Sequence, residues 1–184
     1  MAKRLCIFKG ALVAASVIAG AAIITASTAF AFGLRVNNTA SQPIGVWRLT
    51  DDPAGERGAA VWACPPNNEA VRMALRYGSL PPGICPVGSK AILKVVGAVA
   101  GDQVEVTDAG VAVNGRLLPN TKPLDQDGLG RPLPRVQRGE GKVRPGEVWL
   151  LSTYNAASFD SRYFGPVTVD HLKSRAEPLW IWEE

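Results

Sequence analysis

The longest apolar segment of this 184-residue chain runs from Gly10 to Leu34 and contains no charged residue. Its 25 residues are enough to cross a bilayer as a helix. Three cations precede it, and positive charge beside a membrane helix stays on the cytoplasmic side. We therefore expect residues 1–34 to be a basic cytoplasmic start and a single inner-membrane anchor. Residues 35–184 would then be an exported domain that faces the periplasm.

A cleaved secretory signal is the competing interpretation of the same segment. Ala29-Phe30-Ala31 offers a small-x-small cleavage site after a basic start and an apolar middle. The mature protein would then be secreted into the periplasm. The apolar run is long for a signal peptide, which favours the anchor, and both interpretations export the body of the protein.

Beyond residue 34 the pattern changes to short apolar stretches that alternate with polar residues and are separated by Gly, Pro and Asn. Alternation with a period of two predicts half-buried strands. Asn68 as a cap and Gly78 as a stop predict a short helix over residues 68–77. Strands are expected at 46–49, 58–63, within 89–102, at 104–106, 111–113, 147–151 and 179–182. The sequence thus predicts a mainly β domain with short helices.

Two further regions are less regular. Residues 118–146 are rich in Pro, Gly and charge, and predict a long loop, which in a compact domain is usually functional or mobile. Residues 169–173 are expected to form one helical turn. In the last strand, Trp180 and Trp182 are predicted to lie in the core rather than at a membrane surface.

The basic charge of the chain belongs largely to its N-terminus. The formal net charge is +4, but Lys3, Arg4 and Lys9 precede residue 35 and no acid does, which leaves +1 on the exported part. Nucleic-acid binding requires a clustered basic face on the folded body. We therefore expect no nucleic-acid partner.

Cys64 and Cys85 both lie in the predicted exported part, and each is followed by proline. Two cysteines in an oxidising compartment are expected to form a disulfide, although two reduced thiols remain the alternative. No metal site is expected, because His171 is the only histidine and no Cys-x-x-Cys spacing occurs. No cofactor is expected either.

Lys94 lies inside an otherwise apolar run, Ile92-Leu93-Lys94-Val95-Val96. On an edge strand its side chain would point to solvent. If it is desolvated instead, its pKa falls toward neutrality, and the neutral amine is a base. The run alone leaves both possibilities open.

With one histidine and no metal ligands, most hydrolytic schemes are excluded, but a serine nucleophile with a lysine base is not. Three segments of the chain are Thr39-Ala-Ser41-Gln-Pro43-Ile-Gly45, Leu93-Lys94-Val-Val-Gly97-Ala-Val-Ala-Gly101-Asp102 and Ser158-Phe-Asp160-Ser161-Arg162-Tyr-Phe-Gly165. In this order they resemble the conserved boxes of type I signal peptidases. The Ser-x-Pro-x-Gly form of the first box, and the two-cysteine loop between the first two, most resemble the conjugative-transfer subgroup, the TraF peptidases.

The resemblance implies a catalytic dyad in which Ser41 is the nucleophile and Lys94 the general base. It also implies that the Ser41 backbone N–H and the Thr39 hydroxyl stabilise the oxyanion. Gly45 would permit close approach of the substrate.

In the third box, the resemblance implies that Ser158 orients the base lysine by a hydrogen bond. Asp160 and Arg162 match a charge pair at the floor of the site, with a structural ion pair as the alternative to a direct catalytic role. Many family members have Gly-Asp-Asn before this box, whereas this chain has Ser152-Thr153-Tyr154. The roles attached to that trio are therefore not transferred.

The function implied is a membrane-anchored serine endopeptidase that cuts an exported precursor with small residues before the scissile bond. A conjugative pilin subunit is the expected substrate, with cyclisation of the pilin as a possible outcome. One alternative is a general leader peptidase that acts on many exported proteins. Another is a non-catalytic tethered β-domain of a secretion apparatus, in which Lys94 is merely solvated.

Overall fold

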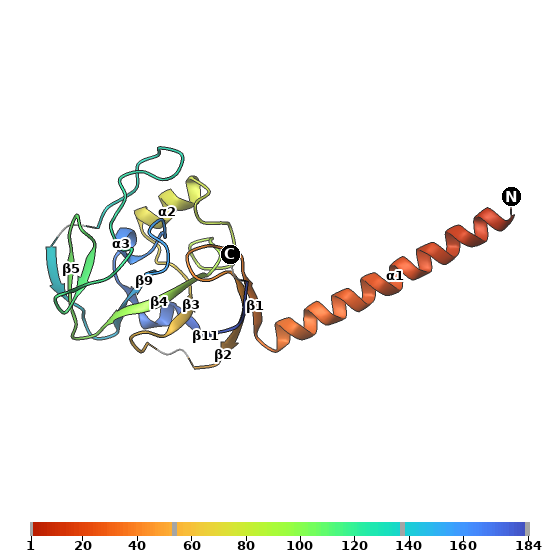
Figure 1. The fold of residues 1–184 in the computed structure, drawn as a ribbon, viewed down its shortest axis with the longest axis horizontal. Helices are drawn as coiled ribbons and strands as arrows, with labels where there is room; N and C mark the ends of the chain where they lie inside the picture. Colours follow the sequence, from red (N-terminus) through yellow and green to blue (C-terminus); the bar gives the residue numbers. More distant parts are fainter. Residues whose placement is uncertain (1, 53–54, 137–138, 183–184) are drawn as a thin grey trace. The chain divides into compact units, whose positions relative to one another are not determined.

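The computed structural model describes residues 2–52, 55–136 and 139–182 (Figure 1), and the chain divides into two units, Met1–Arg35 and Val36–Glu184. The first unit contains one long helix, α1 (Ala2–Ala31). Across the described residues, we found no helix that combines the length and the apolar character needed to cross a membrane. The predicted anchor is therefore not confirmed and stays a prediction.

The second unit is mainly β, as predicted, and its larger sheet has seven strands in the order β1-β2-β11-β3-β4-β9-β10. The pairings that the structure resolves around its centre are all antiparallel. The strands are β1 (Leu34–Asn37), β2 (Gly45–Thr50), β3 (Ala60–Ala63), β4 (Ile92–Val99), β9 (Glu147–Leu151), β10 (Val167–Thr168) and β11 (Leu172–Ile181).

A second sheet of four strands, in the order β7-β6-β5-β8, lies at one end of the body beyond β4 (Figure 1). Its strands are β5 (Gln103–Val106), β6 (Val111–Val113), β7 (Arg116–Leu117) and β8 (Gly139–Lys142). Asn114 and Gly115 both have positive φ, 51° and 78°, and form the two-residue turn between β6 and β7. Such primed turns match the twist of the strands they join, and the Asn-Gly pair favours them.

Three short helical segments complete the fold: α2 (Glu69–Arg76), α3 (Ser161–Phe164) and the 3₁₀ turn η1 (Val169–His171). The Asn68 side chain accepts a hydrogen bond from the Val71 N–H and caps α2, as predicted. Cys64 and Cys85 form the predicted disulfide, which encloses α2. The bridge ties the end of β3 to the segment that leads into β4.

The core lies on both faces of β4 and β9. Val61, Val96 and Leu150 belong to the largest cluster of buried apolar side chains, with α2 packed against it. Trp149 and Leu151, which alternate with Leu150, belong to a second cluster under the four-stranded sheet. Both faces of these two central strands are therefore buried, which fixes their register firmly.

Several elements differ from the sequence prediction for identifiable reasons. β8 lies where the sequence predicts a long loop. The prediction missed this strand because all four of its residues are exposed and only its pairing with β5 makes it a strand. β11 begins seven residues before the predicted start at 179. The prediction missed its first part because the inward positions there include Ser174 and Ala176, which are not large apolar residues. α3 and β10 are too short to leave a periodic pattern.

The predicted burial of Trp180 and Trp182 is wrong. Trp180 is 69% exposed and Trp182 is 44% exposed. The cause is a register shift between Pro178 and Trp180, where β11 continues its pairing with β2. Gly45 lies opposite this irregularity, and a Cβ there would lie 2.2 Å from the Trp180 carbonyl oxygen. The lack of a side chain at Gly45 therefore lets the backbone of β11 approach closely in this structure.

Candidate active site

Lys94 lies on β4, which is bordered by β3 and β9 and is therefore not an edge strand. Its backbone pairs with Val61, and the whole residue is only 3% exposed. Burial disfavours the charged amine and lowers the pKa of Lys94 from its ordinary 10.5 to about 8. The negative charge of Asp160 opposes this change, and the positive charge of Arg162 adds to it. The interpretation that Lys94 is buried and desolvated is confirmed.

The Lys94 amine has no hydrogen bond or ion pair with any residue that the structure describes. A buried ammonium without such partners is costly, so the neutral amine is favoured far more than in solvent. A neutral amine with a pKa near 8 is suited to accept a proton at mildly alkaline pH.

Ser41 lies in the loop between β1 and β2 and shares a pocket of about 550 Å³ with Lys94. Thr39 and Ser158 line the same pocket. Four of the six residues that the sequence resemblance selects are thus brought to one cavity from three separate parts of the chain. Asp160 and Arg162 are buried and do not line it.

The Thr39 hydroxyl lies 3.3 Å from Ser41 Oγ and 2.8 Å from Asn37 Oδ1. The Asn37 amide nitrogen donates to three carbonyl groups, so its oxygen is an acceptor. Thr39 therefore donates its single hydrogen to Asn37 and accepts from the Ser41 hydroxyl. To donate to an oxyanion, Thr39 must first release Asn37.

Ser158 is 4% exposed, and its hydroxyl has no hydrogen-bond partner among the described residues. A buried hydroxyl without a partner is uncommon and often marks a functional position. The hydrogen bond from Ser158 to Lys94 stays a prediction.

Asp160 and Arg162 form a fully buried, two-bond ion pair, with Arg162 Nε and Nη2 each 2.8 Å from a carboxylate oxygen. Arg162 also donates to three backbone carbonyls, those of Asn120, Ala156 and Ser152. All five N–H donors of the guanidinium are therefore used. The pair joins the loop after β9 to the region after β7, which is the structural role that the sequence left as the alternative.

No group of three His, Cys, Asp or Glu side chains in the described ranges is arranged to hold a metal ion.

Comparison with protein families matches residues 9–182 to the family described as signal peptidase, peptidase S26. The chain belongs to this family. A plasmid transfer protein TraF of Escherichia coli is 41% identical over 172 residues, which cover 93% of this chain and 96% of the relative. The conjugal transfer protein TraF of Agrobacterium tumefaciens (strain 15955) is 37% identical over 169 residues, covering 90% of this chain and 94% of the relative. These relatives identify the TraF subgroup of the family.

Among solved structures, the chain is similar to a signal peptidase I from Enterococcus faecalis V583. The sequences are 17% identical, and the match covers 65% of this chain and 95% of the other, with a TM-score of 0.35.

Two residues that sequence reasoning left unassigned contact the loop of Ser41 directly. Asn37 bonds five atoms of residues 39–43 through its side-chain amide. Ser152 donates from Oγ to the Ser41 carbonyl at 2.5 Å. The position of Asn37 two residues before Thr39 fits an Asx turn, which was a readable local signal. Nothing local to Ser152 indicates a partner 111 residues away.

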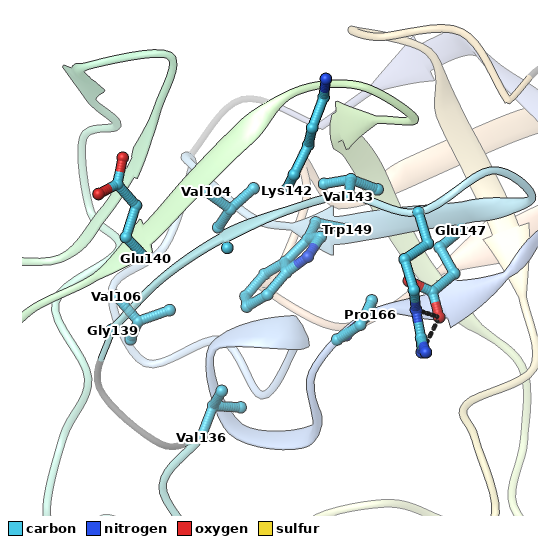
Figure 2. Close-up of a pocket in the computed structure, with 12 residues that line it drawn as sticks. Val104, Val106, Val136, Gly139, Glu140, Lys142, Val143, Glu147, Trp149 and Pro166 are labelled. Carbon is cyan, nitrogen blue, oxygen red and sulfur yellow. Dashed lines mark hydrogen bonds and ion pairs between the residues drawn. The ribbon is translucent and has the colours of Figure 1, made fainter.

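A second pocket, of about 460 Å³, lies under the four-stranded sheet (Figure 2). Trp149 lies in its middle, between the valines of β5 and the ion pair of Arg144 and Glu147. None of the residues that match the family boxes lines this pocket. The pocket that holds Ser41 and Lys94 is the one lined by residues of all three family boxes.

Proposed function

We propose that this protein is a membrane-anchored serine endopeptidase in which Ser41 is the nucleophile and Lys94 the general base. One observation carries the proposal. A lysine that is 3% exposed, with its pKa lowered to about 8, shares a pocket with a serine hydroxyl at the family's nucleophile position. A desolvated amine beside a hydroxyl is the arrangement that activates a serine without histidine.

In the first half of the reaction, Lys94 Nζ takes the proton from Ser41 Oγ while Oγ bonds to the scissile carbonyl carbon. The peptide C–N bond then breaks, and Lys94 returns the proton to the leaving amine, so that an acyl-enzyme remains. The Ser41 backbone N–H and the Thr39 hydroxyl stabilise the oxyanion. Ser158 Oγ hydrogen-bonds Lys94 and orients it toward Ser41.

The second half decides the product. Attack of water on the acyl-enzyme releases a linear chain, whereas attack by the substrate's own terminal amine releases a cyclic one. The similarity to TraF proteins of plasmid and conjugal transfer supports a conjugative pilin precursor as the substrate. Family membership supports small residues before the scissile bond.

The N-terminal segment would hold this domain at the periplasmic face of the inner membrane. The basic start, the uncharged run of residues 10–34 and a disulfide in the second unit support that location. Fractionation of cells that express the full chain tests it: recovery with soluble periplasmic proteins would point to the cleaved signal instead.

The decisive experiment compares maturation of the pilin precursor by the wild-type protein, Ser41→Ala and Lys94→Met. Each variant is expected to lower the rate on the order of a thousandfold or more, because nucleophile and base act as a unit. Lys173→Met, which changes an exposed lysine outside the pocket, is the matched control. Normal maturation by Ser41→Ala would exclude the catalytic role and leave the non-catalytic tethered domain.

Mass spectrometry of the mature pilin then separates the two outcomes of the reaction. A product one water lighter than its linear sequence demonstrates cyclisation, and a product of linear mass excludes it. If the protein instead processes many unrelated exported precursors at similar rates, the general leader peptidase is the correct function.

A further inference from the structure

The loop that carries Ser41 is held largely by side chains. It connects β1 to β2, and the carbonyls of residues 39, 41, 42 and 43 accept hydrogen bonds from side-chain donors. Asn37 supplies three of these bonds, at 2.9, 3.0 and 3.0 Å, and Ser152 supplies the one to the nucleophile itself. Trp47 Nε1 also donates to the Pro43 carbonyl, at 3.1 Å, so three side chains hold the loop, and Ser152 is the one that bonds to Ser41 itself.

Ser152 is fully buried and uses every polar group it has. Its N–H donates to Asp160 Oδ2 at 3.0 Å, and its carbonyl accepts from Arg162 Nη2 at 2.9 Å. Its hydroxyl donates to the Ser41 carbonyl and accepts from the backbone N–H groups of Tyr154 and Asn155. Ser152 is therefore the direct link between the buried ion pair and the nucleophile.

The bond from Ser152 fixes the peptide plane that follows Ser41. If the hydroxyl is removed, the Ser41 carbonyl loses its partner and the plane can rotate, which moves Oγ relative to Lys94. Misplacement of a reacting group by about 1 Å can cost about a hundredfold in rate. Asn37 acts on both sides of Ser41 in the chain, through the carbonyl of Thr39 before it and those of Gln42 and Pro43 after it.

We infer that Ser152 and Asn37 are positioning residues that clamp the Ser41 loop for catalysis. The Asp160–Arg162 pair supports the clamp through Ser152. The inference rests on the proposed function for its kinetic consequence, but the clamp itself is a property of the fold that is measurable without activity.

The test uses full-length protein and a fluorogenic peptide with Ala-x-Ala before the cleavage site. Ser152→Ala is expected to lower kcat about 10- to 100-fold with KM changed by less than about twofold. Ser152→Thr, which keeps the hydroxyl, is expected to recover much of the lost kcat. Asn37→Asp replaces the donor to three carbonyls by an acceptor and is expected to lower kcat similarly, whereas Asn67→Asp, on an exposed side chain bonded to Arg72, is not.

Ser161→Ala is the matched control for Ser152→Ala. Ser161 is also a fully buried serine, and its hydroxyl accepts a hydrogen bond from the Leu150 N–H at 2.9 Å, but it has no bond to the Ser41 loop. Ser161→Ala loses one hydrogen bond of the side chain and Ser152→Ala loses three, so the melting temperature should fall in both variants and more in Ser152→Ala. Equal kcat values for the two variants would overturn the inference.

Amide hydrogen exchange gives a second, activity-independent result. Exchange in the peptide that spans residues 38–44 should accelerate in Ser152→Ala and Asn37→Asp, and remain at the wild-type rate in Ser161→Ala. Unchanged exchange in all three would refute the clamp even if kcat falls. If Ser41→Ala retains wild-type activity, the proposed function fails, and the exchange data still decide whether the clamp exists.

Discussion

Lys94 and Arg162 are both buried cations, yet their surroundings are opposite. Arg162, in the third family box, uses all five of its N–H donors and pairs with Asp160. Lys94, in the middle of β4, has no hydrogen bond or ion pair among the described residues and faces the pocket of Ser41. One region satisfies its charge completely, and the other leaves the amine without such partners in the pocket that it shares with Ser41.

The difference shows how to distinguish a structural cation from a reactive one. A guanidinium stays charged at all relevant pH values, so the protein must surround it with acceptors. An amine can lose its proton, and burial without partners makes it do so at lower pH. Lysine at 94 and arginine at 162 are therefore not interchangeable. The role of Arg162 can be tested by removing its partner Asp160, and that of Lys94 by removing its amine.

The largest expected effect comes from removing the partner of Arg162. Asp160→Ala leaves a buried guanidinium uncompensated and should lower the free energy of unfolding by about 3–5 kcal/mol. Urea unfolding of the variant against wild type measures it. A loss below about 1 kcal/mol would mean that Arg162 relaxes to solvent and is not the fixed structural cation described here.

Removal of the Lys94 amine should have the opposite sign. Below pH 8 the amine is protonated in both states, and the folded state bears the cost of burying the charge. Lys94→Met should therefore stabilise the fold at pH 7 by on the order of 3 kcal/mol, since a tenfold change in a protonation constant corresponds to about 1.4 kcal/mol.

That advantage of Lys94→Met should decline as the pH rises from about 8 toward 10.5. In this window the unfolded state still binds the proton and the folded state does not, so wild-type stability increases with pH. Urea unfolding of both proteins at a series of pH values provides the measurement. A stability difference that does not change with pH would show that the folded-state pKa of Lys94 is not lowered.

A smaller effect tests whether the charge of Asp160 influences the pKa of Lys94. The rate of peptide cleavage should increase with pH, reach half of its maximum near pH 8 and level off above it, as Lys94 becomes neutral. The Asp160 charge raises the pKa of Lys94, so Asp160→Asn should move this limb to lower pH, by less than about one pH unit. A shift to higher pH would contradict the assignment of the limb to Lys94.

The smallest effect is expected at an exposed pair. Arg48 and Glu177 form an ion pair at 2.7 Å on neighbouring strands, with both side chains substantially exposed. Solvent screens such pairs, so Glu177→Gln should leave the melting temperature within experimental error. A clear loss would show that burial is not what separates Arg162 from other paired arginines in this fold.

Much of the candidate site was predictable because most of its residues lie in short segments that resemble conserved boxes of the family. Ser41, Lys94 and Ser158 were selected by resemblance to the conserved boxes of type I signal peptidases, and the structure brings all three to one pocket. Lys94 could not be placed inside or outside from its own run, because period-two alternation does not distinguish a central strand from an edge strand. β3 and β9, which pair with β4 on either side, decide that question.

The parts of the fold that were missed share a physical cause. β8 consists of exposed residues, and β11 has small or polar residues at several inward positions, so neither has the apolar alternation on which prediction depends. Trp180 and Trp182 were assigned to the core from their size alone. Their exposure follows from the shifted register at the end of β11, which is a property of the strand pairing.

By itself, the sequence determined the kinds of residues available for chemistry and their order along the chain, and it predicted the mainly β character of the body and the disulfide. The tertiary structure decided which charges lie in a low-dielectric interior and which side chains form hydrogen bonds with the loop that carries Ser41. The bond between Ser152 and Ser41 joins residues 111 positions apart. Burial and such long-range hydrogen bonds depend on how strands pair and pack, and no local pattern of residues encodes them.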